Sequence, residues 1–270
     1  QGVDYSACGN TTIRRLETRT NYTINNLYLL SNNTLIFNVT SDDLILNATQ
    51  LIGNLNLTAL TNLSLYSTSF INASDKGNPN GTFEGKGVNG GASQGGGGGG
   101  YGGIGATSEN NIKGGQQYGD PFAPSLFGSP GGAGNNGPNL ATRGGGLVYL
   151  NISGTLWNNV TIAADGETIS VITNNGGAGS GGSIWIDTAN YYGTGKLSAI
   201  GGNTPNGANI GGSGGGGRIA VYYNTTNSEV AFNTTDIKSP ESPDPTVTSG
   251  DPGTAVFIDK DDKNIYIVGG

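Results

Sequence analysis

The sequence contains no histidine, no methionine and a single cysteine, Cys8. Without histidine, imidazole general bases, histidine-containing metal sites and Cys-His dyads are excluded, and one cysteine excludes multi-cysteine zinc sites. These absences remove most of the common catalytic and metal-binding arrangements. We therefore expect a protein that is not an enzyme and that has no cofactor other than attached N-linked glycans.

Charge and long apolar runs are also scarce. Only 11% of residues are charged, and 12 basic against 19 acidic residues give a net charge of −7. Nucleic-acid binding normally needs clustered lysine and arginine, so this balance argues against a nucleic-acid partner. No apolar run approaches the roughly 20 residues of a transmembrane helix, and we expect no membrane span.

Sequons of the form Asn-x-Ser/Thr are abundant. In several of them the middle residue is aliphatic, such as Val39 and Leu57, so in a strand the Asn and Thr lie on one face and the aliphatic residue on the other. Chance matches in a chain rich in Asn and Thr are the alternative. We predict N-glycosylation at Asn10, Asn21, Asn32, Asn38, Asn47, Asn56, Asn62, Asn72, Asn80, Asn151, Asn159, Asn224 and Asn233, where glycans would supply the hydration that charges do not.

The sequence also indicates an extracellular environment. It opens at Gln1 without a targeting segment, as expected of a secreted or cell-surface protein whose signal peptide has been removed; a shortened chain is the alternative. In an oxidising compartment the odd cysteine, Cys8, is either a buried free thiol or bonded to another chain.

The region 26–85 shows the alternation of half-buried strands, for example Leu55, Leu57 and Ala59 against polar Asn56 and Thr58. Sequons at three positions there recur every nine residues, which predicts glycosylated β-solenoid turns built from strands of about six or seven residues and short corners. Residues 1–25 lie outside this pattern as an N-terminal extension.

Glycine accounts for 51 of 270 residues, against roughly 7% in ordinary soluble proteins. The glycine-rich block 86–146 has the composition of a linker. In the region 147–223, however, glycine clusters precede strands at a regular interval: those at Gly145, Gly181 and Gly216 begin 36 and 35 residues apart. This repeat is typical of stacked β-solenoid turns, so we expect the glycine block to pack as extended, polyglycine-like segments held by backbone hydrogen bonds.

The region 224–270 combines a Pro-rich strap with a predicted C-terminal β-hairpin, in which two apolar strands flank the charged loop 259–263. The fold class predicted overall is all-β: a parallel β-helix or β-solenoid with glycine-rich packed loops and this hairpin. An isolated hairpin is marginally stable in water, so its apolar residues need a surface, which we expect to belong to a second subunit. These residues are Val256, Ile258, Ile265 and Ile267.

The run 144–223 carries a further pattern: a Gly-Gly-Gly cluster, Ser-Gly-Thr-Leu at 153–156, Thr-Ile-Ala-Ala-Asp-Gly at 161–166, Gly-Ser-Gly-Gly-Ser-Ile-Trp-Ile at 179–186, and Gly-Gly-Gly-Gly-Arg-Ile-Ala-Val-Tyr-Tyr at 214–223. It resembles the glycine-rich parallel β-helix segments of large secreted or cell-surface proteins of protists and some bacteria, including surface-fibre and mastigoneme-like proteins and some adhesins. The resemblance implies a structural or adhesive role without a family active site.

Enzymes with β-helix folds, such as polysaccharide lyases and hydrolases, use clustered carboxylates or a basic residue. We expect Arg218 to be exposed or in a salt bridge, and Asp42 and Asp43 to lie in a solvated turn. The carboxylates are Asp42, Asp43, Asp165, Glu167, Asp187, Asp259, Asp261 and Asp262. The aromatic residues that can stack on sugars, or cover a neighbouring subunit, are Tyr101, Trp157, Trp185, Tyr191 and Tyr192.

These observations favour a structural subunit of a secreted, heavily N-glycosylated extracellular filament or cell-surface fibre or coat, which would be a homo-oligomer. A carbohydrate-binding β-helix adhesin, with a carbohydrate or cell-surface partner, is the alternative. A polysaccharide lyase or hydrolase of the β-helix type is a second, less favoured alternative, because no cluster of catalytic residues stands out in the sequence.

Overall fold

The computed structural model describes residues 22–25, 28–39, 43–66, 68–77, 84–134, 142–170, 176–227, 230, 232, 235–242 and 247–269. Within these residues 14 strands form one mixed, curled sheet, and no α-helix is present. This confirms the predicted all-β class. The strands are β1 (Tyr22–Asn25), β2 (Tyr28–Val39), β3 (Asp43–Asn47), β4 (Gln50–Ala59), β5 (Asn62–Leu65), β6 (Phe70–Asn72), β7 (Leu147–Asn158), β8 (Thr161–Ala163), β9 (Ser183–Tyr192), β10 (Lys196–Ser198), β11 (Arg218–Tyr223), β12 (Thr225–Thr226), β13 (Thr254–Asp259) and β14 (Ile265–Val268).

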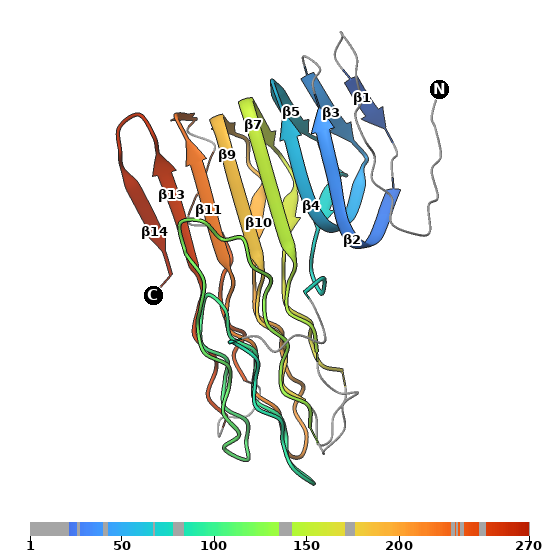
Figure 1. Ribbon diagram of the computed structural model, residues 1–270, viewed down its shortest axis with the longest axis vertical. Coiled ribbons are helices and arrows are strands. Elements are labelled where there is room, and N and C mark those ends of the chain that lie inside the picture. Colours follow the sequence, from blue (N-terminus) through green and yellow to red (C-terminus); the bar gives the residue numbers. More distant parts are fainter. Residues whose placement is uncertain are drawn as a thin grey trace.

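The long strands pair in parallel in the order β4, β7, β9, β11 and β13, and the short strands β6, β8 and β10 form a second parallel row (Figure 1). Val148 lies beside Ile184, and Ile184 beside Ile219, so the glycine-punctuated repeat does set the pairing of successive strands. The strand β14 pairs antiparallel with β13, with Ala255 beside Val268, which confirms the predicted hairpin.

The nine-residue spacing of sequons corresponds to the step from one strand to the next. In the N-terminal strands the paired residues are farther apart in the sequence: Asn38 of β2 lies beside Thr58 of β4, and Asp43 of β3 beside Asn62 of β5. Sequons nine residues apart therefore lie on consecutive strands that are not paired with each other. Each of these strands pairs instead with the second strand along the chain, β2 with β4 and β3 with β5.

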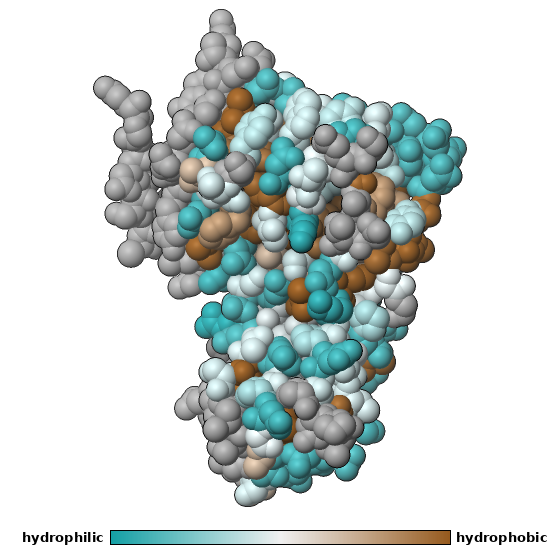
Figure 2. All heavy atoms as spheres, turned by 180° about the vertical axis from the view of Figure 1, so that it is seen from behind, coloured by the Kyte–Doolittle hydropathy of each residue, from teal (hydrophilic) through white to brown (hydrophobic). Residues whose placement is uncertain are grey.

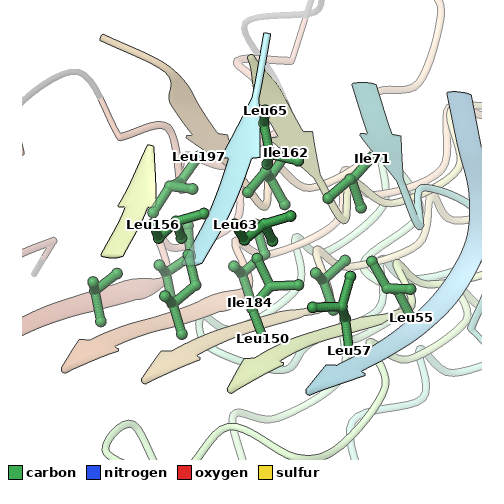
Figure 3. Close-up of a cluster of buried hydrophobic side chains, with 14 of the residues drawn as sticks. Leu55, Leu57, Leu63, Leu65, Ile71, Leu150, Leu156, Ile162, Ile184 and Leu197 are labelled. Carbon is green, nitrogen blue, oxygen red and sulfur yellow. The ribbon is translucent and has the colours of Figure 1, made fainter. Parts of the chain in front are cut away.

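The apolar core lies between the two rows, where alternate residues of each strand point inward (Figure 3). Leu57, Leu150 and Ile186 are paired neighbours on one row and are fully buried. Opposite them, Ile162 and Leu197 of β8 and β10 are also buried and paired. Period-two alternation thus specified which side chains fill the core.

Below the sheet, the glycine-rich segments run side by side as extended chains without strand pairing (Figure 1). The amides of Gly97, Gly98 and Gly99 donate to the carbonyls of Val88, Ala106 and Ala178, three different segments, at 2.8–2.9 Å. The amide of Gly100 then returns to the first segment, at Gly85. This period of three is the repeat of a polyproline II-type helix, whereas the amides of a β-strand alternate between two neighbours.

We call these segments the glycine bundle. It takes chains from the expected glycine-rich block and from the expected repeat region: 84–91, 95–106, 113–115, 128–133, 176–182 and 211–217. A Cβ atom on Gly98 would come closer than 3.0 Å to the carbonyl of Ser213. Glycine is required there for close approach of backbones, which agrees with the packing predicted for the block.

Candidate functional site

Four sequon asparagines lie at positions that are accessible to solvent. Asn47 and Asn159 are exposed, and Asn56 and Asn151 are half-buried between inward-facing neighbours on β4 and β7. The side-chain oxygen of Asn159 accepts a hydrogen bond of 3.3 Å from the amide of Thr194. Asn56, Asn151 and Asn159 match the predicted arrangement, in which Asn faces outward and the aliphatic residue inward. The sequon at Asn47 does not, because its Thr49 is buried and Ala48 is half-buried.

Three other sequon asparagines form hydrogen bonds through their side-chain amide groups. The oxygen of Asn72 accepts from the amide of Ser74 at 2.8 Å. The nitrogens of Asn62 and Asn224 donate to Asp43 and Asp261 at 2.6 and 2.5 Å. An attached glycan leaves one hydrogen on the amide nitrogen. Modification of Asn62 and Asn224 therefore has to preserve or replace these two hydrogen bonds.

The remaining predicted modification sites fall outside the described side chains. Asn32 and Asn38 lie on β2, where the backbone alone is described, and Asp42 lies outside the described residues. The possible intermolecular disulfide at Cys8 lies outside the described residues too, together with the sequons at Asn10, Asn21, Asn80 and Asn233.

The aromatic residues singled out for sugar contacts separate into two groups. Trp157 is 37% exposed and packs edge-on against Tyr192, with ring centroids 5.7 Å apart. Trp185 is half-buried and lies 5.0 Å from Tyr149. Tyr191, by contrast, is buried in the core, where burial raises its pKa to about 12. It is not available as a surface contact.

Tyr101 is fully buried as well, because it joins the glycine bundle to the sheet. Its hydroxyl lies 2.6 Å from the hydroxyl of Ser183 on β9, and the guanidinium of Arg218 lies 5.5 Å from its ring centroid. Arg218 also donates from Nε to the carbonyl of Tyr118 at 2.9 Å. The prediction that Arg218 is exposed or in a salt bridge was wrong: it is 6% exposed, and burial lowers its pKa. These partners are distant in sequence, so no local pattern could identify them.

The described carboxylates form hydrogen bonds or an ion pair at separate places in the structure. Asp165 accepts from the hydroxyl of Ser198 at 2.6 Å, and burial raises its pKa. Asp187 on β9 forms an ion pair of 2.8 Å with Lys260, which lies in the turn that joins the hairpin strands β13 and β14. Asp259 accepts the amides of Asp261 and Asp262 within that turn, and Glu167 accepts the amide of Arg143. No group of three or more metal-ligating side chains occurs in the described part of the chain.

The edge strand β14 presents the largest exposed apolar side chains of the hairpin. Ile265, Tyr266 and Ile267 are 53%, 48% and 57% exposed. Seen from behind, apolar residues gather toward this edge of the molecule (Figure 2). Val256 is 1% exposed and lies on β13, which pairs with β11 on one side and with β14 on the other. Of the four hairpin residues predicted to need a partner surface, only Ile265 and Ile267 are substantially exposed; Ile258 is half-buried.

Comparison with family models, curated proteins and solved structures found no match for this chain. The described residues contain no helix that is long and apolar enough to cross a membrane. The features of the described residues that bear on function are therefore the outward sequons, the outward aromatic residues and the β14 edge.

Proposed function

We propose that the protein is a structural subunit of a secreted, N-glycosylated extracellular filament or cell-surface fibre, in which the parallel rows are turns of an open β-solenoid. The proposal rests on the exposed apolar edge strand β14. An edge strand offers unpaired backbone donors and acceptors, and soluble proteins usually protect such edges with charge, proline or a covering segment. The four residues of β14 contain none of these: Ile265, Tyr266, Ile267 and Val268.

A second copy of the chain is the partner that best fits this edge. Within the described residues, β14 ends one side of the sheet, and β2, which pairs with β4, lies at the other side. Addition of one copy's β14 to the far edge of the next copy is a head-to-tail contact. Such a contact leaves a free edge at each end and produces an open filament when its rotation does not close a ring.

The distribution of sequons supports the same contact. The last sequon is at Asn233, so the hairpin formed by β13 and β14 carries none, whereas seven sequons lie among the described side chains of the rest of the sheet and its corners. Glycans on the sides would hydrate a chain that has few charges and prevent lateral association. The hairpin edge would stay bare and available for pairing.

The experiment compares the wild-type chain with the double variant Ile265→Lys/Ile267→Lys, produced in a secretory host and examined by negative-stain microscopy and light scattering. We expect filaments from the wild type and monomers from the variant, because two ammonium groups on an edge strand oppose pairing. Val88→Lys is the matched control, since Val88 is 52% exposed and lies in the glycine bundle, away from β14.

Filaments formed equally by all three proteins would contradict the β14 contact. A wild type that stays monomeric at high concentration and binds soluble polysaccharides would favour the carbohydrate-binding adhesin instead. The observation behind that second candidate is the pair of outward aromatic contacts, Tyr149 with Trp185 and Trp157 with Tyr192.

A further inference from the structure

Several sequons are preceded by an aromatic residue at a fixed position. Aromatic residues make up 8% of the sequence, so about one of the sequons should have one two residues before its Asn by chance. Four sequons do, and all of them lie in the described part of the chain. The pairs are Phe70 with Asn72, Tyr149 with Asn151, Trp157 with Asn159, and Tyr222 with Asn224.

In each pair the two side chains lie on the same face of the structure. Residues two apart on a strand point the same way, with Cβ atoms about 6 to 7 Å apart, which applies directly to the pairs on β6 and β7 that end at Asn72 and Asn151. Asn159 and Asn224 directly follow the last residues of β7 and β11. The burial pattern agrees, because the residue between the two members is buried in all four pairs while both members are accessible to solvent. The intervening residues are Ile71, Leu150, Asn158 and Tyr223.

Neighbouring groups hold three of these aromatic side chains in place. Tyr149 packs against Trp185 on the next strand, and Trp157 against Tyr192. The hydroxyl of Tyr222 donates to the carbonyl of Phe122 at 2.8 Å. A ring that is already fixed loses little conformational entropy when another group packs on it, which favours a weak contact.

We propose that these aromatic side chains bind the first sugar of the protein's own N-linked glycans: the N-acetylhexosamine attached to each Asn packs its C–H face on the ring two residues upstream. The inference rests on the proposed glycosylation. The sugar is tethered next to the ring, so its effective concentration is high and little translational entropy is lost. Apolar C–H groups would cover the negative face of the ring and remove it from water.

This contact gives the outward aromatic residues a role within the glycosylated protein. Each ring would fix the direction in which its glycan leaves the sheet, and the glycan would cover a ring that otherwise exposes apolar surface. The pair formed by Trp157 and Asn159 offers the clearest test, since both residues are exposed.

The experiment is a double-mutant cycle at this pair. Trp157→Ala removes the ring, and Thr161→Ala removes the sequon while keeping Asn159. The wild type, both single variants and the double variant are produced in a eukaryotic secretory host, and an endoglycosidase trims each glycan to one N-acetylglucosamine. We expect Trp157→Ala to raise the unfolding equilibrium constant on the order of two- to tenfold more with the sugar at Asn159 than without it.

Loss of the contact between Trp157 and Tyr192 affects both halves of the cycle and therefore cancels. Phe122→Ala is the matched control: Phe122 is 41% exposed and precedes no sequon, so its effect should be the same with and without the sugar at Asn159.

A second readout, NMR spectroscopy of the sugar, does not depend on stability. Sugar C–H protons at Asn159 should shift upfield in NMR spectra of the wild type, through the ring current, and return to ordinary positions in Trp157→Ala.

The outcomes separate the two proposals. Mass spectrometry that finds Asn159 unmodified would contradict glycosylation at this site and the sugar contact with it. An occupied Asn159 with equal effects of Trp157→Ala in both halves of the cycle, and no upfield shift, would overturn the sugar contact alone.

Discussion

The apolar sheet and the glycine bundle pack by opposite means. In the sheet, side chains such as Leu57 and Leu150 fill the space between two rows of strands, and the chain gains stability by removing apolar surface from water. In the bundle, residues 95–100 are buried as completely but have no side chains. The amides of Gly97, Gly98, Gly99 and Gly100 donate to carbonyls of neighbouring segments, and backbones approach to a distance that any Cβ would prevent.

The difference shows what each region can tolerate. The sheet needs large side chains at alternate positions and accepts polar residues, including sequons, on its outer face. The bundle needs glycine where its backbones come closest, and it accepts mainly small buried side chains elsewhere, such as Ala178 and Ser180. The two regions alternate along the chain, because the bundle segments 176–182 and 211–217 lead directly into β9 and β11.

The strongest test of this comparison removes a side chain from the sheet. Leu150→Ala should destabilise the protein by about 2 to 5 kcal/mol, because Leu150 is fully buried and its truncation leaves a cavity. Denaturant unfolding followed by circular dichroism would measure it. A loss below about 1 kcal/mol would show that the apolar core is not the main source of stability in this region.

The next test adds a side chain to the bundle. Gly98→Ala should destabilise by about 1 to 3 kcal/mol, since the new Cβ meets the backbone of Ser213 and one chain has to move. Gly91→Ala is the control: its Cβ would meet only the end of the Gln94 side chain, so the same methyl group should cost almost nothing. Equal effects at the two positions would contradict close backbone packing.

The smallest expected effect is a pH dependence of stability at Asp75, where the chain leaves the sheet after β6. Asp75 follows β6, and its amide donates to the carbonyl of Asp165 at 3.0 Å. Burial, then the charges of Glu167 and Asp165, raise the pKa of Asp75 from 3.8 to about 6 despite Lys76 and Arg143 nearby. The folded state therefore binds a proton more tightly than the unfolded state does. This contribution to stability is complete below pH 3.8 and is lost as the pH rises through 6.

Asp75→Asn should abolish this part of the pH dependence, by about 1 kcal/mol or less, because solvent screens a partly exposed group. Asn suits the position, since Asp75 has a φ of 59°, in the left-handed region where Asn is favoured. Unfolding free energies at pH 4 and pH 7 would be compared for the two proteins. An unchanged pH dependence would assign the effect to other carboxylates.

Much of the sheet was predictable because its signal is local. The alternation around Leu55 and Leu57, and the repeat that begins at Gly145 and Gly181, correctly predicted strands, inward residues and the pairing of β7 with β9. The hairpin of β13 and β14 was predicted from two apolar runs around a charged loop. The outward position of Asn151 followed from the same period of two.

Other features have no local signal. The burial of Arg218 depends on Tyr101 and Tyr118, which are distant in the sequence and come from the glycine bundle. Val256 is buried although it alternates with Ala255 and Phe257 of the apolar core, so both faces of β13 are covered at this point. In both cases periodicity told which residues share a face, but not which segment covers that face.

The sequence alone determined the all-β class, the inward side chains of each strand and the positions of the sequons, because these depend on residue type and a period of two. Only the tertiary structure decided which glycine segments meet in the bundle, which aromatic residues remain at the surface and which strand forms the open edge. The physical reason is that glycine carries no side-chain pattern. Its neighbours are set by backbone hydrogen bonds between segments far apart in the chain, and these bonds exist only in the folded structure.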